Sequence, residues 1–162
     1  MSVDLSKKRI LIFVVAYNAE KTIASVLNRI PPELRGANVE VLVIDDSSKD
    51  DTFAASLAHE KTIEDLKITI LRTPLNQGYG GNQKLGYRYA IDNGFDYVAL
   101  VHGDGQYAPE KLPELLAPLL NEEAGAVMGS RMMEKGELCN GGEPGPDWDD
   151  IIALLKERKN YL

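Results

Sequence analysis

The sequence predicts a three-layer α/β/α sandwich with a mostly parallel sheet. Short apolar runs rich in Val, Ile and Leu alternate along the 162 residues with segments of helical spacing. Such runs are typical of strands buried on both faces of a sheet. Regular alternation of strand and helix favours parallel pairing with right-handed crossovers, so helices are expected on both faces.

The first elements follow from apolar runs and from the residues that interrupt them. Strands are expected at residues 9–15, 39–44, 67–71, 97–101 and 124–128. The helix after the first strand is stopped by Pro31-Pro32, because proline cannot continue a helix. Its apolar face consists of Ile23, Val26, Leu27 and Ile30.

The later helices have their own start and stop signals. The helix after the second strand carries Phe53 and Leu57. A third helix runs through Leu85 and Tyr89 and ends near Asn93-Gly94, which is a C-cap pattern. Pro109 at a first helical position opens a fourth helix. Its apolar face consists of Leu112, Leu115, Leu116 and Leu119.

Composition restricts the class of protein. The length suits one domain with a substantial core, and the apolar runs are too short to cross a bilayer. Cys139 is the only cysteine, which excludes an intramolecular disulfide and favours a reducing, cytoplasmic setting. The formal charge of −7 argues against nucleic acid as the main partner, but it is compatible with a phosphate ligand bound by a few local cations and amides.

The pattern changes after residue 135. Residues 1–135 are expected to form the sandwich, and the glycine- and proline-rich residues 136–146 a linker. Residues 147–162 predict a short amphipathic helix whose apolar face packs on the sandwich. A subunit contact in a homo-oligomer and peripheral attachment to a membrane surface are the alternatives for this helix.

Two adjacent carboxylates follow the second strand directly. Asp45 and Asp46 come after the apolar run 41–44, and carboxylates at the end of such a strand emerge where open α/β sheets bind ligands. With the first strand central, the loops that begin at Ala16, Asp45, Thr73 and His102 open on one edge. The local alternative is that Ser48 or Asp50 caps the next helix.

The loop after the first strand offers groups that suit a nucleoside. Tyr17 has a flat ring for stacking, and Asn18 and Glu20 can hydrogen-bond to a base or sugar. The alternative is that Asn18 or Glu20 caps the following helix. No G-x-G-x-x-G pattern follows this strand, which disfavours a nicotinamide or flavin dinucleotide.

The loop after the fourth strand has the alternation of a metal site. In an extended chain, His102, Asp104 and Gln106 project to one side and could face a single Mg²⁺ or Mn²⁺ ion. Gly103 and Gly105 would let a diphosphate approach the backbone. The alternative is a tight glycine turn in which Asp104 hydrogen-bonds its own backbone.

Further candidates for phosphate contacts surround these loops. The loop 76–81, which contains Gly78, supplies backbone amides at a helix start, with Lys84 and Arg88 further along the helix. Arg131, after the fifth strand, places a guanidinium on the same rim. A flexible loop before a solvated helix, and a surface ion pair for Arg131, are the alternatives.

The order and spacing of these loops are familiar in combination. The segments concerned are residues 15–20, 43–52, 76–81, 102–106 and 129–131. Together they resemble family 2 glycosyltransferases, and most of all the dolichyl- or polyprenyl-phosphate sugar transferases. The resemblance covers roughly residues 8 to 135 and implies the Rossmann-like GT-A fold, a nucleotide-sugar domain.

The resemblance also implies roles. The metal would be bound by His102, Asp104 and Gln106, and catalysis would depend on Asp104 and Arg131. His102 stands where the family usually has the first acid of Asp-x-Asp-x-Gln, which tilts the metal preference from Mg²⁺ toward Mn²⁺. Donor-binding residues would be Ala16, Tyr17, Asn18, Glu20, Asp45, Asp46, Gly78, Lys84 and His102.

The reaction implied is inverting, metal-dependent transfer of a sugar from a UDP- or GDP-sugar, with a lipid phosphate as acceptor. An ionised phosphate acceptor needs no general base, and the sequence offers no convincing one. Family members continue beyond the position of Arg131 with acceptor-binding segments. The alternative is therefore a truncated or non-catalytic nucleotide-sugar-binding module that acts with a partner chain. A nucleotidyltransferase is a third and weaker interpretation.

Overall fold

The computed structural model describes residues 8–36 and 38–129. Within them a parallel sheet has the order β3-β2-β1-β4. Its strands are β1 (Ile10–Ala16), β2 (Val39–Asp45), β3 (Lys67–Arg72) and β4 (Tyr97–His102). The prediction of a parallel sheet with the first strand in a central position is confirmed.

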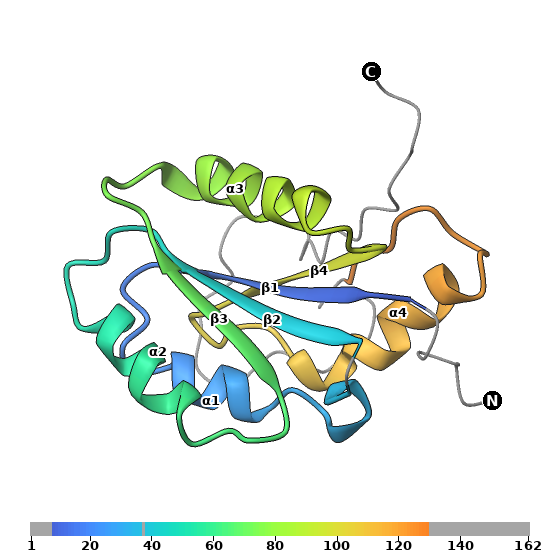
Figure 1. The fold of residues 1–162 in the computed structure, drawn as a ribbon, viewed down its shortest axis with the longest axis horizontal. Coiled ribbons are helices and arrows are strands. Elements are labelled where there is room, and N and C mark those ends of the chain that lie inside the picture. Colours follow the sequence, from blue (N-terminus) through green and yellow to red (C-terminus); the bar gives the residue numbers. More distant parts are fainter. Residues whose placement is uncertain (1–7, 37, 130–162) are drawn as a thin grey trace, which may run out of the picture.

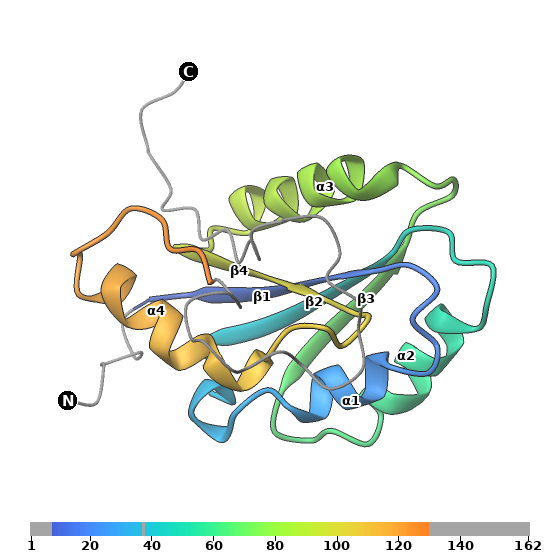
Figure 2. The same ribbon diagram turned by 180° about the vertical axis from the view of Figure 1, so that it is seen from behind.

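Helices cover both faces of this sheet, as predicted. Figures 1 and 2 show α3 on one face and α1, α2 and α4 on the other. The helices are α1 (Ile23–Asn28), α2 (Thr52–Glu60), α3 (Gly78–Asp92) and α4 (Leu112–Leu120), with 3-10 turns η2 (Pro32–Leu34) and η3 (Pro109–Lys111). No helix of the described part is both long and apolar enough to cross a membrane.

The core has two halves because side chains alternate across each strand. In β1, every residue is buried. Ile10, Ile12 and Val14 belong to the cluster that includes residues of α1 and α4, while Leu11 and Phe13 belong to the cluster on the side of α3. A strand buried on both faces explains why the sequence of β1 is continuously apolar.

The predicted fifth strand is wrong. Residues 124–128 form no strand in the structure. Glu122 adopts a left-handed conformation (φ 61°), and the amide of Ala124 returns to the carbonyl of Pro118. Val127 packs against the core, but Met128 is exposed, so the segment has too little apolar contact to act as a buried strand. The predicted linker 136–146 and helix 147–162 lie outside the described residues.

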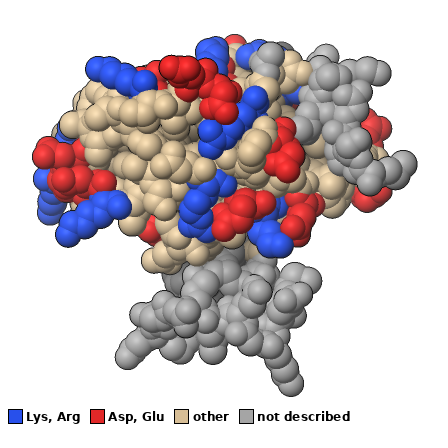
Figure 3. All heavy atoms as spheres, turned by 90° about the horizontal axis from the view of Figure 1, so that it is seen from below, with Lys and Arg blue, Asp and Glu red and all other residues tan. Residues whose placement is uncertain are grey.

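The face of the sandwich that carries α1, α2 and α4 has charges of both signs. Figure 3 views the molecule from the side on which α1, α2 and α4 lie in Figure 1. Lysine, arginine, aspartate and glutamate are interspersed over the described surface in this view. Such mixed charge keeps a surface solvated without giving it a strong field of one sign.

Gly86 allows α3 to lie close to β1. A Cβ atom at this position would overlap the ring of Phe13. We therefore predict that Gly86→Ala lowers the free energy of unfolding by about 1–3 kcal/mol, the usual cost of overpacking a core. Urea denaturation measures this change.

Gly80→Ala is the matched control, because Gly80 lies in the same helix and a Cβ there meets nothing within 4 Å. This control should be neutral or stabilising by up to about 1 kcal/mol, since alanine is the better helix former. Equal stability of the two variants would contradict the packing described.

Candidate active site

A cleft opens at the carboxyl ends of the strands. It has a volume of about 310 Å³. The lining residues are Val15, Ala16, Tyr17, Asp46, Asn76, Gly78, Tyr79, Asn82, His102, Gly103 and Asp104. The register places Ala16 beside Asp45 and Val15 beside His102, so the loops after β1, β2 and β4 leave the sheet at one level. The predicted convergence of these loops is confirmed.

The structure divides the predicted site residues into two groups. The cleft is lined by Ala16, Tyr17, Asp46, Gly78, His102 and Asp104. It is not lined by Asn18, Glu20, Asp45, Lys84 or Gln106. Arg131 lies outside the described residues. The roles expected for all of these residues remain predictions. Only the residues of the first group are placed where they could contact a ligand in this cleft.

Asn18 and Glu20 join the loop after β1 to the loop after β2. The amide of Asn18 donates to Ser48 Oγ at 2.9 Å, and the amide of Lys49 donates to Asn18 Oδ1 at 3.0 Å. The amide of Asp51 donates to Glu20 Oε2 at 3.4 Å. No side chain caps α1, so these two residues act across the loops instead of along the chain.

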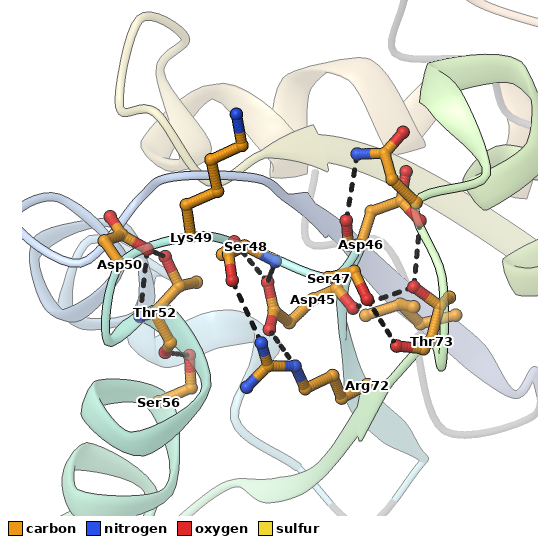
Figure 4. A network of polar contacts seen from close by, with 12 residues as sticks. Asp45, Asp46, Ser47, Ser48, Lys49, Asp50, Thr52, Ser56, Arg72 and Thr73 are labelled. Atoms are coloured by element: carbon orange, nitrogen blue, oxygen red, sulfur yellow. Dashed lines mark hydrogen bonds and ion pairs between the residues drawn. The ribbon is translucent and has the colours of Figure 1, made fainter.

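Asp45 faces the protein interior. Its side chain is fully buried, and Oδ1 accepts hydrogen bonds from the amide (3.1 Å) and the hydroxyl of Ser48. Oδ2 accepts no hydrogen bond from the described residues but lies 3.3 Å from Arg72 Nε, which compensates its charge. Figure 4 shows the guanidinium of Arg72 between Asp45 and Ser48. A buried carboxylate requires such a partner.

Asp46 lies beside the cleft and secures the start of α3. Its Oδ1 accepts hydrogen bonds from Thr73 Oγ1 at 2.9 Å and from the amide of Gln77 at 2.8 Å. Its carbonyl accepts a third from Asn76 Nδ2 at 3.0 Å. Both adjacent acids are buried, but they have different partners and only Asp46 lines the cleft, because neighbouring residues leave a strand on opposite sides.

The loop after β4 forms the tight turn that was the alternative to a metal site. Asp104 Oδ1 accepts a hydrogen bond from the amide of Gln106 at 3.1 Å, and Gly105 has φ +79°. Thr22 Oγ1 donates to the carbonyl of Gly103 at 2.7 Å, which ties the turn to α1. Asp104 itself is exposed at the cleft. The turn thus presents this carboxylate while it directs Gln106 elsewhere.

His102 lies within a group of aromatic side chains. The hydroxyl of Tyr79 lies 3.0 Å from His102 Nε2, a hydrogen bond whose donor depends on the imidazole tautomer. The ring of Tyr107 meets the imidazole edge-on, with centroids 4.6 Å apart. Burial, together with the negative charge of Asp104, raises the pKa of Tyr79 against the opposing effect of a hydrogen bond with Gln83. Tyr79 therefore remains a neutral phenol near pH 7.

The donors at the cleft fit a cation that is shared with a ligand. Among residues 8–36 and 38–129, no group of three His, Cys, Asp or Glu side chains is arranged to hold a metal ion. His102, Asp104 and Asp46 nevertheless line one cleft. Mg²⁺ and related ions commonly use one or two carboxylates and take their other ligands from water and phosphate oxygens.

Tyr79 and Asn82 are lining residues that sequence reasoning did not assign to the site. Asn82 is buried, its Nδ2 donates to the carbonyl of Ile44 at 3.0 Å, and its Oδ1 has no hydrogen-bond partner in the described structure. Asn82 follows Gly78 by four residues, which places both on one face of α3. That spacing was the available signal, but glycine and asparagine do not form the apolar stripe by which a buried helix face is usually recognised.

Two relatives of the chain are named as sugar transferases for lipid phosphates. An undecaprenyl-phosphate mannosyltransferase of Micrococcus luteus is 33% identical over 134 residues, which are 82% of this chain and 52% of the relative. A UDP-N-acetylglucosamine–dolichyl-phosphate N-acetylglucosaminyltransferase of Methanococcus voltae is 28% identical over 147 residues, covering 84% and 57%. The chain thus spans about half the length of the curated relatives it matches.

Two solved structures with a similar fold were determined with a nucleotide and Mn²⁺. Glucosyl-3-phosphoglycerate synthase from Mycobacterium tuberculosis, in complex with Mn²⁺, UDP and phosphoglyceric acid, is 26% identical with a TM-score of 0.55, over 71% of this chain and 40% of that chain. A mannosyltransferase from Pyrobaculum calidifontis, in complex with GDP-Man and Mn²⁺, is 23% identical with a TM-score of 0.62, over 78% and 36%. The second similarity shows the fold alone.

The family itself is shown by a match over most of the chain. Residues 11–144 match the model of the family described as Glycosyl transferase family 2. This range contains the described sheet except Ile10, all of the lining residues and the loops that carried the resemblance. The chain belongs to glycosyl transferase family 2 and has the Rossmann-like α/β fold of its GT-A structural neighbours.

Proposed function

We propose that this chain binds a nucleoside-diphosphate sugar and contributes to inverting, metal-dependent transfer of the sugar to a polyprenyl or dolichyl phosphate. The observation that carries the proposal is the cleft, in which aromatic rings, carboxylates and a helix start meet at the carboxyl edge of the sheet. Parallel α/β sheets bind nucleotides at this edge, where the order of strands reverses.

The nucleoside would lie between groups from β1, β2 and α3. Tyr17 and Tyr79 are 46% and 48% exposed and both line the cleft, so their rings are available for stacking on a base. Asp46 Oδ1 is used by Thr73 and Gln77, which leaves Oδ2 to accept a base or sugar donor. Both UDP- and GDP-sugars suit this arrangement.

The diphosphate would lie between the start of α3 and the loop after β4. Gly78 lines the cleft with φ +71° at the first residue of α3, where amides and the helix dipole favour an anion. Asp104 and His102 would hold the cation, with Mn²⁺ better suited to the imidazole. When bound, the cation neutralises charge that develops on the departing diphosphate. Arg131 and Lys84 are proposed to contact phosphate from the rim.

The acceptor is proposed from the relatives. The two curated relatives described above act on undecaprenyl phosphate and dolichyl phosphate by name. Such an acceptor would bring the cleft to a membrane surface, so we propose peripheral association. A donor-binding module that acts with a partner chain is the second candidate, because the described cleft accounts for donor binding alone.

Transfer to a lipid phosphate tests the proposal directly. The full chain, a set of UDP- and GDP-sugars, Mn²⁺ and polyprenyl phosphate in vesicles should give a sugar-labelled lipid product. Donor binding without product would favour the binding module. Absence of both binding and product would contradict the proposed function.

Asp104 should control metal-dependent donor binding. In Asp104→Asn the amide oxygen can still accept the hydrogen bond from Gln106, so the turn is kept while the charge is lost. We predict at least about tenfold weaker binding of a nucleotide sugar in the presence of Mn²⁺, equivalent to about 1.4 kcal/mol. Isothermal titration calorimetry with and without Mn²⁺ measures this effect.

Asp65→Asn is the control, because Asp65 is an exposed carboxylate that pairs with Arg35 and does not line the cleft. This variant should bind the donor like the unmodified chain. Unchanged Mn²⁺-dependent binding in Asp104→Asn would remove Asp104 from the proposed metal site.

His102 should set the choice of metal. Replacing it in His102→Asp supplies a second carboxylate, a harder ligand that suits Mg²⁺ better than an imidazole does. We predict that the ratio of Mn²⁺-supported to Mg²⁺-supported donor binding falls several-fold in this variant. His102→Asn, which also removes the contacts with Tyr79 and Tyr107 but adds no charge, is the control. An equal ratio in all three proteins would contradict a metal contact at this position.

A further inference from the structure

We propose that Arg72 and Asp45 are positioning residues for the nucleoside: the ion pair between the half-exposed Arg72 and the buried Asp45 holds Ser48, and Ser48 holds the backbone that carries Tyr17. This inference rests on the proposed function, because it explains how one wall of the donor cleft is kept in place. It gives Asp45 a role inside the protein and involves Arg72, which lies outside the cleft lining.

The burial of Asp45 makes a charged partner necessary. Asp45 is fully buried at the end of β2, and Arg72 lies beside it in register at the end of β3. The distance from Arg72 Nε to Asp45 Oδ2 is 3.3 Å. A buried carboxylate without a partner is costly, so removal of the guanidinium would leave this charge uncompensated and shift the position of Asp45.

Ser48 connects this pair to the neighbouring loop. Its amide and hydroxyl donate to Asp45 Oδ1, and its carbonyl accepts a hydrogen bond from Arg72 Nη2 at 2.9 Å. Its hydroxyl oxygen also accepts a hydrogen bond from the amide of Asn18 at 2.9 Å. Amide, carbonyl and hydroxyl of Ser48 are all engaged, so a shift of either charged side chain displaces Ser48.

Tyr17 depends on both of its neighbours in the chain. The carbonyl of Ala16 accepts a hydrogen bond from the amide of Asp46 at 2.9 Å, and Asn18 is held in a left-handed conformation with φ 51°. The amide of Asp46 bonds to Ala16, and the hydroxyl of Ser48 accepts from the amide of Asn18. Asp46 and Ser48 both belong to the segment that directly follows β2. The direction of the Tyr17 side chain is therefore set by the loop that Arg72 and Asp45 secure, which Figure 4 shows from close by.

Arginine is required here because two groups must be bound in different directions. Arg72 Nε faces Asp45, while Nη2 donates to the carbonyl of Ser48. The guanidinium carbon also lies 5.9 Å from the ring centroid of Phe53 in the first turn of α2. A lysine ammonium is a point charge without this planar fork, so Arg72→Lys should restore charge compensation but only part of the geometry.

The test compares two probes of the cleft in the full chain. UDP and GDP with Mg²⁺ require the nucleoside wall, whereas pyrophosphate with Mg²⁺ requires only the helix start and the loop after β4. In Arg72→Met we expect nucleotide binding to weaken by about tenfold and pyrophosphate binding to stay within about twofold, where tenfold corresponds to about 1.4 kcal/mol. Arg72→Lys should lie between Arg72→Met and the unmodified chain. Calorimetry well below every melting temperature gives both affinities.

Two further variants keep the test conclusive if Arg72→Met does not fold. Ser48→Ala keeps the ion pair but removes the hydroxyl that accepts from Asn18, and it should weaken nucleotide binding selectively. Arg35→Met is the matched control: Arg35 also pairs with a carboxylate, Asp65, and donates to two carbonyls, but it lies between α1 and β2, away from the cleft residues. It should lower the melting temperature without selective loss of nucleotide binding.

The outcomes separate this inference from the proposed function. If the unmodified chain binds neither UDP nor GDP, the proposed function and the positioning role are both overturned. If it binds them and Arg72→Met and Ser48→Ala bind them equally well, the positioning role alone is wrong. Equal weakening of nucleotide and pyrophosphate would show a general loss of structure and would also overturn it.

Discussion

The register of β1 against its two neighbours determines where three of the loops around the cleft begin. Because Ala16 pairs with Asp45 and Val15 with His102, three loops leave the sheet at the same level. The fourth wall follows from α3, whose start is fixed to β2 by Asp46 and whose approach to β1 is possible because residue 86 is glycine. A shift of one residue in this register would exchange the two buried faces of β1 and separate the loops.

The loops above the sheet are held by polar contacts, whereas the sheet is held by apolar packing. Backbone groups near a sheet edge need hydrogen-bond partners when water is excluded, and side chains of the adjoining loops supply them here. Ser48, Asn18 and Thr73 act in this way, and Asp45 does so from a fully buried position. Tyr17, Asp104 and Gly78 line the cleft and take no part in these contacts, so support of the loops and the proposed contact with a ligand are divided between different residues.

Much of this arrangement could be predicted from the sequence. The spacing of apolar residues, with the proline and glycine signals, predicted β1 to β4 and the four helices. Parallel pairing of the strands then placed the loops at one edge. The segment 124–128 misled because its apolar composition suits a strand, whereas its contacts are those of a surface loop around Val127. The spacing of apolar residues could not show which of Asp45 and Asp46 faces the cleft, since that depends on where α3 lies. The face of α3 toward the sheet escaped prediction because its buried residues, Asn82, Gly86 and Ala90, are small or polar.

Mapping of a nucleotide on the folded chain tests the central claim, that these separate loops form one site. In ¹H–¹⁵N correlation spectra, titration with UDP or GDP and the diamagnetic ion Mg²⁺ should shift amide signals of residues 15–17, 46, 76–82 and 102–104 together, with one common affinity. Signals of α2 and α4 should stay in place. Shifts confined to one loop, or collected on the face of α1, α2 and α4, would contradict the account.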